Sequence, residues 1–380
     1  MKILHFHDSP HVHGGATQYL NQVLQALNAA GHENHLFSIG PRVDINNIVS
    51  QHTFEYQWPK SVLQRRRDFY KTHAPLADKL AATIESVRPD LIHVHNCTHF
   101  RKTVFNTILY KGVKSVMTVH DFSLDWKSSP QRKLSGAKAL LSNALNKPQH
   151  QISRLAVLDA MDLFLCPTHA LMNGLGLPPN KSVCHRLPIQ PADASEIPLD
   201  KLRMFFAGTL FDSKGVDVLI DALASAKHLL GDFALEIAGS GDRHQDLVDQ
   251  VAGNALQNNI KFLGQLDQQQ MDSAYQRANL QVLPSRVPEN SPLTVLEAGA
   301  RGRPAIASHA GGVPELITPE RGWTFPSEDS SNLANSLVGI ANDLPSLNIK
   351  GQNMRKWVRA EFDPTEHWQQ LAQYYTHLIS

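Results

Sequence analysis

The sequence predicts an α/β protein made of two doubly wound domains. Short apolar runs alternate with amphipathic helical stretches along the chain, as they do in folds with parallel sheets. The alternation starts afresh after residues 187–198, which hold three prolines and little periodicity. The chain also has 380 residues, more than one hydrophobic core normally supports. We therefore expect one domain at 1–190 and a second at 191–355.

The first domain opens with a strand, a glycine loop and a helix. Residues 2–6 form an apolar strand, Gly14 and Gly15 follow a short loop, and apolar residues at helical spacing then continue to Gly31. Three further apolar runs are typical of buried strands: 91–95, 115–119 and 162–166. This order is that of a sheet whose strands are connected by helices.

The second domain repeats this order. A strand at 203–207 is followed by a glycine-containing turn and a helix at 216–230. The other predicted elements are strands at 234–238, 260–263, 280–283 and 305–308, a helix at 293–301 and mostly helical chain from 330 onward. Ligands of open α/β sheets bind beyond the carboxyl ends of the strands, so we expect the site in a cleft between two domains that face each other.

The composition is that of an ordinary soluble globular protein, with 42% hydrophobic and 19% charged residues. No apolar run approaches the roughly 20 residues that span a bilayer, and the N-terminus turns polar too soon for a secretory signal. The three cysteines, Cys97, Cys166 and Cys184, show neither metal nor redox spacing. These features predict a protein of the reducing cytoplasm.

Charge is distributed unevenly between the two halves. Residues 1–190 carry 21 basic against 12 acidic side chains, whereas 191–380 carry 15 against 23. Residues 126–154 are basic without any acidic side chain, and their apolar residues fall at roughly helical spacing. Such a helix can lie on an anionic membrane, although a helix packed on its own domain explains the pattern at least as well. No motif of a nucleic-acid-binding module is present, so no nucleic-acid partner is expected.

Two carboxylates in the second half indicate the chemistry most clearly. Glu289 is expected in the loop before a helix, and Glu297 about a turn and a half inside that helix. Ser291 is a good N-cap and Pro292 a good first helical residue. A helix N-terminus attracts anions, and carboxylates bind sugar hydroxyls. Together they predict a site for a sugar that carries phosphate, such as a nucleotide-sugar.

The loop after the predicted strand at 203–207 is typical of a phosphate cradle. It runs from Gly208 to Gly215, with Lys214 near its end, and leads directly into a helix, so that backbone amides and an ammonium can approach an anion. The spacing is not that of a Walker A loop. Alone, a lysine at the start of a helix is usually a local cap. With Glu289 and Glu297 downstream, the loop becomes a specific signal.

These motifs resemble the retaining glycosyltransferases of family 4, which have the GT-B fold. The matching positions are Gly208, Leu210, Lys214, Gly215, Gly239, Gly241, Glu289, Glu297, Ala298, Gly302, Pro304, Gly311, Gly312 and Glu315. The resemblance implies two Rossmann-like domains that face each other across a cleft, and a C-terminal helix at 356–380 that crosses back to the first domain. It also implies a nucleotide-diphosphate-sugar donor, most commonly a UDP-sugar, with no obligatory metal or other cofactor.

The resemblance assigns the site residues as follows. Lys214 binds the donor diphosphate, Glu289 contacts the donor sugar and Glu297 holds the ribose hydroxyls. The donor-binding positions are Gly14, Gly15, Gly208, Thr209, Lys214, Gly239, Gly241, Asn290, Ser291, Pro292, Leu293 and Glu297. The catalytic positions are His120, Asp121, Lys214 and Glu289, with His120 beside the donor sugar at the end of a strand.

One position departs from the family pattern. Many members carry arginine where this chain has Thr209, and that arginine shares the diphosphate with the lysine. A threonine hydroxyl supplies a hydrogen bond without charge, so one charge-assisted contact is missing. Arg243 and Arg286 are candidates to replace it. A catalytically weak GT-B partner subunit is therefore an alternative function.

The resemblance implies transfer of a sugar to an acceptor hydroxyl with retention of configuration. The acceptor would be a glycan or a lipid-linked molecule, in polysaccharide, capsule or lipopolysaccharide synthesis, at the inner face of the plasma membrane if 126–154 binds lipid. A less favoured alternative is a zinc hydrolase. Three pairs of histidines at i, i+2 spacing would supply its ligands: His5 with His7, His11 with His13, and His93 with His95.

Overall fold

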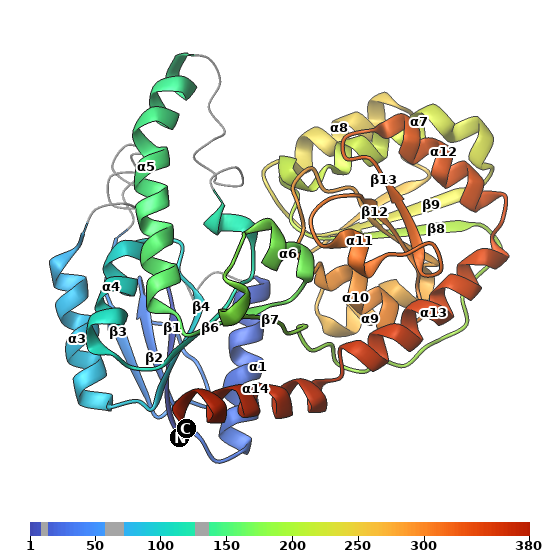
Figure 1. Ribbon diagram of the computed structural model, residues 1–380. Helices are drawn as coiled ribbons and strands as arrows, with labels where there is room; N and C mark the ends of the chain where they lie inside the picture. Colours follow the sequence, from blue (N-terminus) through green and yellow to red (C-terminus); the bar gives the residue numbers. More distant parts are fainter. Residues whose placement is uncertain (9–13, 58–71, 126–136) are drawn as a thin grey trace. The chain divides into compact units, whose positions relative to one another are not determined.

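The computed structural model describes residues 1–8, 14–57, 72–125 and 137–380, without the side chains of 137–146 (Figure 1). The chain divides into two compact units. The N-terminal unit comprises Met1–Arg186 and Thr365–Ser380, and the C-terminal unit comprises Leu187–Pro364. Both units are layered α/β structures, and each is described by itself.

The N-terminal unit contains a seven-stranded parallel sheet in the order β3-β2-β1-β4-β5-β6-β7. The strands are β1 (Lys2–His7), β2 (Glu33–Ile39), β3 (Ser50–Phe54), β4 (Leu91–Asn96), β5 (Ser115–Thr118), β6 (Leu163–Cys166) and β7 (Ser182–Cys184). After β1 the chain builds one side of the sheet with β2 and β3, then returns to build the other side from β4 onward. The direction of winding therefore reverses between β1 and β4, which is the topological switch point of this sheet.

Helices cover this sheet and follow the predicted alternation. They are α1 (Gly15–Ala29), α3 (Ala74–Val87), α4 (Arg101–Lys111), α5 (Ala137–Ala160), α6 (His169–Gly174) and α14 (Pro364–Ile379), with 3-10 turns η1 (Phe122–Leu124) and η4 (Pro179–Lys181). Helix α1 buries one apolar stripe, which includes Leu20, Val23 and Leu24. The amide of Leu171 is bonded to the hydroxyl of Thr168, the N-cap of α6.

The C-terminal unit contains a six-stranded parallel sheet in the order β10-β9-β8-β11-β12-β13. The strands are β8 (Leu202–Ala207), β9 (Phe233–Ala238), β10 (Ile260–Gly264), β11 (Leu280–Leu283), β12 (Ala305–Ser308) and β13 (Gly322–Phe325). The same reasoning puts the switch point of this sheet between β8 and β11. The loops that follow these two strands are those predicted to bind the donor.

The helices of this unit are α7 (Val216–Leu230), α8 (His244–Gly253), α9 (Gln268–Arg277), α10 (Leu293–Ala300), α11 (Val313–Leu316), α12 (Ser330–Ala341) and α13 (Pro345–Glu361), preceded by the 3-10 turn η5 (Asp212–Lys214). Helix α7 packs on α12, and α10 packs on α13. Their buried aliphatic side chains form the core against the sheet.

Two boundaries differ from those predicted. Residues 187–190, placed in the first domain by the sequence, belong to the second unit, where the Ile189 amide donates to the Phe362 carbonyl at 3.0 Å. The C-terminal segment returns at 365 rather than 356, because α13 continues to Glu361 and buries Met354 and Val358 in the second unit. The proline at 364 then begins α14.

The predicted linker at 187–198 is fastened to the C-terminal unit. The fully buried guanidinium of Arg303 donates to the carbonyls of Ser195 and Glu196, at 2.8 and 3.1 Å. Burial lowers the pKa of Arg303 to about 10, which leaves it charged at neutral pH. The linker is therefore part of a folded unit rather than a free connection.

Candidate functional site

The switch point of the C-terminal sheet brings together two residues that the sequence assigned to one site. Lys214 ends η5 in the loop after β8, and Glu289 lies in the loop after β11. The Lys214 Nζ atom is 2.7 Å from Glu289 Oε1, and the Ser285 hydroxyl donates to the same oxygen at 2.6 Å. Both charged side chains are mostly buried, with 26% and 16% of their surfaces exposed. An ammonium and a carboxylate therefore meet at the edge where ligands of such sheets bind.

The loops after β8 and β9 pack against each other through their backbones. The amides of Gly208 and Leu210 donate to the carbonyls of Ala238 and Ser240, at 3.0 and 2.9 Å. Gly239 has φ 132°, and a Cβ atom there would lie 1.8 Å from the Gly208 carbonyl oxygen. Only glycine permits this approach. The amides of Gly208 and Leu210 are therefore engaged within the protein, and Lys214 supplies the positive charge of the predicted cradle.

The N-terminus of α10 differs from the prediction by one residue. The helix begins at Leu293, and its N-cap is Pro292, whose ψ of 110° is extended rather than helical. The predicted cap, Ser291, is thus one residue too early for its hydroxyl to reach the first helical amides. The Ser291 hydroxyl oxygen is buried without a partner in the described part of the chain. The loop before the helix is held by the Gly312 amide, which donates to the Glu289 carbonyl at 2.7 Å.

Glu297 lies inside α10 and is supported by two side chains that the sequence did not identify. The Tyr275 hydroxyl donates to Glu297 Oε2 at 3.3 Å, and Arg301 donates to the Glu297 carbonyl at 2.9 Å. The Arg301 guanidinium lies 4.9 Å from the centre of the Tyr275 ring. Burial raises the pKa of Glu297, and the positive charge of Arg301 opposes that rise. No local pattern marks Tyr275 as a partner, since a single aromatic residue on a helix is usually part of the core.

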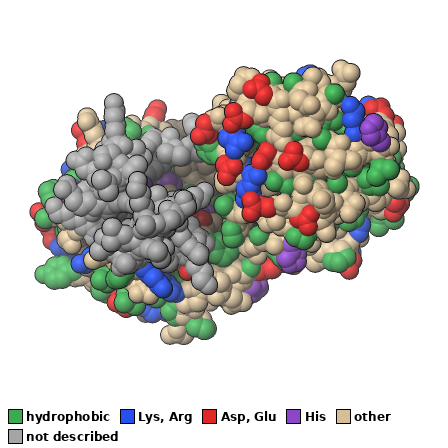
Figure 2. All heavy atoms as spheres, turned by 90° about the horizontal axis from the view of Figure 1, so that it is seen from above, with side chains coloured by type: hydrophobic (Ala, Val, Ile, Leu, Met, Phe, Trp, Pro, Cys, Tyr) green, Lys and Arg blue, Asp and Glu red, His purple; other side chains and the backbone are tan. Residues whose placement is uncertain are grey.

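Arg243 and Arg286, the two candidates to replace the family arginine absent at Thr209, differ in how tightly they are paired. Arg286 forms a bidentate pair with Asp217, at 2.7 and 2.6 Å, and this pairing raises its pKa. Arg243 has 35% of its side chain exposed and pairs with Asp212 at 3.0 Å. Its amide donates to the carbonyl of Leu210, directly after Thr209. Figure 2 shows acidic and basic side chains interleaved on the face of the C-terminal unit that this view presents. Arg243 is the more exposed of the two, at 35% against 19% for Arg286.

The predicted reactive residues of the N-terminal unit follow β5. Burial lowers the pKa of His120 to about 4, so its imidazole is neutral at pH 7. The centre of the Tyr19 ring lies 5.5 Å from the centre of the His120 ring. The Asp121 carboxylate accepts the Ser123 amide at 2.8 Å and so caps η1. Gly15 is the first residue of α1, with Gly14 as its N-cap.

The histidine pairs form a buried network. His5, His93 and His95 are inaccessible to solvent, and they place one possible ligand atom each within 4.8 Å of the others. His5 Nδ1 lies 3.0 Å from His95 Nε2, and His93 is bonded through both nitrogens, to Thr118 and Tyr375. The rings of His93 and His95 are tilted by 36° with centres 3.9 Å apart.

A catalytic zinc ion also needs an open coordination position for water or substrate. Both nitrogens of His93 are already bonded, to Thr118 and Tyr375, so His93 could bind zinc only by giving up one of these hydrogen bonds. His11 and His13 lie outside the described residues.

Helix α14 is anchored to the N-terminal unit by this network. The Tyr375 hydroxyl lies 2.6 Å from His93 Nδ1, and His367 Nδ1 donates to the Arg186 carbonyl at 2.8 Å. His367 Nε2 is then an acceptor, and the Tyr19 hydroxyl donates to it at 3.0 Å. Helix α14 is thus bonded to α1 through Tyr19 and to Arg186, the last residue of the segment Met1–Arg186.

The basic region at 126–154 is described only in part, because 126–136 and the side chains of 137–146 lie outside the described structure. Of the described side chains, that of Lys147 is exposed, whereas Arg154 donates to the carbonyls of Leu175 and Gly176. In the described part of the chain, no helix combines the length and apolar character that crossing a membrane requires.

Comparison with known families agrees with this geometry. Residues 191–357 match the model of the glycosyl transferases group 1, and residues 13–177 match that of Glycosyltransferase Family 4. The two matches divide between the two units described above. The chain belongs to family 4 of the glycosyltransferases. Its two parallel, Rossmann-like units are those of the GT-B fold.

Three relatives illustrate the range of this glycosyltransferase family. Glycogen synthase of Mycobacterium tuberculosis is 26% identical over 96% of this chain and 90% of its own. A GDP-mannose-dependent phosphatidylinositol monomannoside mannosyltransferase of Corynebacterium glutamicum is 31% identical over 45% of each chain. Among solved structures, Anabaena Alr3699/HepE in complex with UDP and glucose aligns over 99% of both chains, with a TM-score of 0.75 and 18% identity.

Proposed function

We propose that this glycosyltransferase moves a sugar from a nucleotide-diphosphate-sugar to an acceptor hydroxyl with retention of configuration. The observation that carries the proposal is the contact between Lys214 and Glu289 at the switch point of the C-terminal sheet. A phosphate-binding cation and a hydroxyl-binding carboxylate occur there together. The donor joins these same two chemical groups in one molecule.

Departure of the nucleoside diphosphate is the demanding step, since negative charge grows on its phosphate. Lys214 and the N-terminus of α10 stabilise that charge. The bond between the anomeric carbon and the phosphate oxygen breaks while the acceptor oxygen approaches the same face. The departing phosphate takes the acceptor proton. Glu289 is held by Lys214 and Ser285, and it therefore orients sugar hydroxyls rather than attacking the anomeric carbon. The roles of Gly14, Gly15, His120 and Asp121 stay predictions from the family resemblance.

The donor is proposed to be a UDP-sugar, because Alr3699/HepE was solved with UDP. The ribose hydroxyls would be bound by Glu297, which is oriented by Tyr275. Arg243 would supply the second positive charge in place of the arginine missing at Thr209. Neither role requires a metal ion or another cofactor.

The acceptor is proposed to be a glycan or a lipid-linked molecule, as in polysaccharide, capsule or lipopolysaccharide synthesis. The relatives that act on glycogen and on a phosphatidylinositol mannoside support this class. The excess of basic side chains in residues 1–190 supports attachment at the inner face of the plasma membrane. Thr209 keeps one alternative open, a weakly active subunit that supports another transferase.

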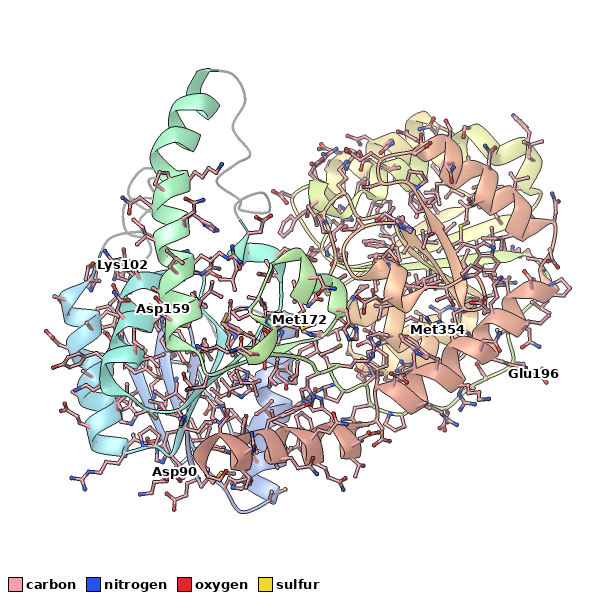
Figure 3. The ribbon with its side chains drawn as sticks, in the orientation of Figure 1. Asp90, Lys102, Asp159, Met172, Glu196 and Met354 are labelled. Carbon is pink, nitrogen blue, oxygen red and sulfur yellow. The ribbon has the colours of Figure 1, made fainter. Side chains whose placement is uncertain are left out.

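The first test is a thermal-shift comparison of UDP, GDP and their sugar conjugates, with and without chelator. Ligand that binds only the native state raises the midpoint of unfolding. We expect a shift with one nucleotide family that is insensitive to chelator and is lost in Glu297→Ala. Glu196→Ala is the matched control, because Glu196 is exposed and lies at the periphery of the same unit (Figure 3). No shift with any nucleotide, together with destabilisation by chelator, would contradict the proposal.

A further inference from the structure

The switch point of the N-terminal sheet holds a buried carboxylate that the proposed chemistry does not use. Asp8 directly follows β1, and its side chain is inaccessible to solvent. Its amide donates to the Asn96 carbonyl at 3.0 Å, which continues the pairing of β1 with β4 beyond the strands. Asp8 therefore lies where the winding of this sheet reverses, at the edge where ligands of open α/β sheets bind.

One oxygen of this carboxylate is fully engaged. Asp8 Oδ2 accepts the amides of Thr98 and His99 at 2.6 and 3.0 Å, and it lies 3.4 Å from His99 Nδ1. Burial alone would raise the pKa of Asp8, but the hydrogen bonds and the charge of His99 reverse that effect and hold the pKa below its usual value. The carboxylate is therefore ionised at neutral pH and is a weak base.

The other oxygen, Asp8 Oδ1, is buried and has no hydrogen-bond partner in the described structure. Buried acceptors are nearly always bonded, and an ionised one left alone is especially unfavourable. Because Asp8 lies at the switch point, a molecule bound there can supply the hydrogen-bond donor that Oδ1 lacks. The other strand-edge carboxylates of this unit contrast with it. Asp90 and Asp162 accept the amides of Lys2 and Ser115 at the opposite, amino-terminal edge of the sheet.

We propose that Asp8 Oδ1 accepts a hydrogen bond from a hydroxyl of the sugar acceptor. This inference rests on the proposed function, since that reaction requires an acceptor hydroxyl. A weak base that stays ionised suits binding and orientation of a hydroxyl rather than removal of its proton. Asp8 is thus a residue for acceptor recognition in the N-terminal unit, with His99 as the side chain that holds its carboxylate.

The test uses Asp8→Asn, which keeps the size of the side chain. The amide oxygen can still accept the two backbone N–H groups, while the amide nitrogen replaces Oδ1, so an acceptor becomes a donor. Asp90→Asn is the matched control, because Asp90 makes one backbone contact at the far edge of the same unit (Figure 3). Binding of methyl α-D-glucopyranoside and methyl α-D-mannopyranoside is followed by saturation-transfer NMR on the full chain with UDP present.

We expect at least one glycoside to bind the unmodified protein and Asp90→Asn alike, and to bind Asp8→Asn about tenfold more weakly or worse. A thermal shift with UDP that is unchanged in Asp8→Asn shows that the donor site and the fold are intact. His99→Gln keeps both backbone bonds to Asp8 and removes only the imidazole, so a smaller loss is expected. It provides a second variant if Asp8→Asn is unstable.

Equal glycoside binding by Asp8→Asn and the unmodified protein would overturn the inference. So would the absence of glycoside binding to a protein that still binds UDP. If UDP fails to bind while glycoside binding depends on Asp8, the acceptor site stands and the proposed donor chemistry falls. The two failures are therefore distinguishable in the same samples.

Discussion

The two sheets reverse their winding in the same way, yet their switch points carry opposite chemistry. In the C-terminal unit a lysine and a glutamate meet beside interleaved acidic and basic side chains. In the N-terminal unit a single buried carboxylate faces backbone amides and a histidine. Parallel topology decides where a ligand can bind, whereas the side chains of the loops decide which ligand fits. We propose the first edge as the site of a diphosphate and the second as the site of a hydroxyl.

The contrast extends to the interior of each unit. The N-terminal unit buries neutral imidazoles, among them His5, His93 and His95, whereas the three histidines of the C-terminal unit are exposed. A buried neutral imidazole must stay unprotonated to remain compatible with the core. The two units should therefore respond differently to acid.

Acidification should produce the largest difference in stability between the two units. The pKa values of His5, His120 and His185 are lowered to about 4, whereas in the unfolded chain they return to 6.5. Between these pH values the unfolded state binds protons that the folded state does not, so stability is lost as the pH falls from 6.5 toward 4. Each such histidine contributes about 1.4 kcal/mol per pH unit in that window.

Hydrogen exchange at pH 7, 6 and 5 would show the difference. We expect protection to fall first in peptides from Met1–Arg186, with Leu187–Pro364 little changed. A parallel loss of protection in both units would show that the buried histidines do not control the acid response.

Replacement of the site lysine should have the next largest effect. Lys214→Met keeps the length of the side chain but removes the charge that stabilises the departing diphosphate. We expect turnover of the nucleotide-sugar to fall about 100- to 1,000-fold. Lys227→Ala is the control, since Lys227 bonds only the Ala255 carbonyl at the surface of the same unit. If Lys214→Met turned over donor at the normal rate, Lys214 would be a structural partner of Glu289 alone.

Substitution of Arg243 or Arg286 should separate ligand binding from stability within the C-terminal unit. Arg243→Gln should weaken UDP binding about tenfold, because one charge-assisted contact is lost. Arg286→Gln should lower stability instead, because it leaves the half-buried Asp217 without its bidentate partner. Calorimetric titration with UDP and urea unfolding separate the two effects. The assignment is wrong if Arg286→Gln weakens UDP binding more than Arg243→Gln does.

The smallest expected effect concerns the anchor of α14. Tyr375→Phe removes the hydroxyl bonded to His93 and should lower the free energy of unfolding by about 1 to 2 kcal/mol. Tyr374→Phe is the matched control on the same helix, where the tyrosine is only half-buried. Equal stability of the two variants in urea would show that this hydrogen bond does not hold the helix in place.

Much of the fold followed from local patterns in the sequence. The predicted strands at 203–207, 280–283 and 305–308 are observed within one residue as β8, β11 and β12. Apolar runs and the glycines between elements suffice for this, because helix and strand periods and turn chemistry act over a few residues. The cap predicted at Ser291 was wrong by one residue, because neighbouring residues permit either of two helix starts.

The sequence by itself determined the two alternating patterns, the glycine loop and the spacing of Glu289 and Glu297, and these were sufficient to indicate the family. Only the tertiary structure decided which groups meet. Lys214 reaches Glu289 across 75 positions, and Asp8 accepts the Thr98 amide across 90. Asp217 holds Arg286, and Tyr275 supports Glu297. Such pairs depend on the order of strands in a sheet and on the burial that results, and neither property is local in the chain.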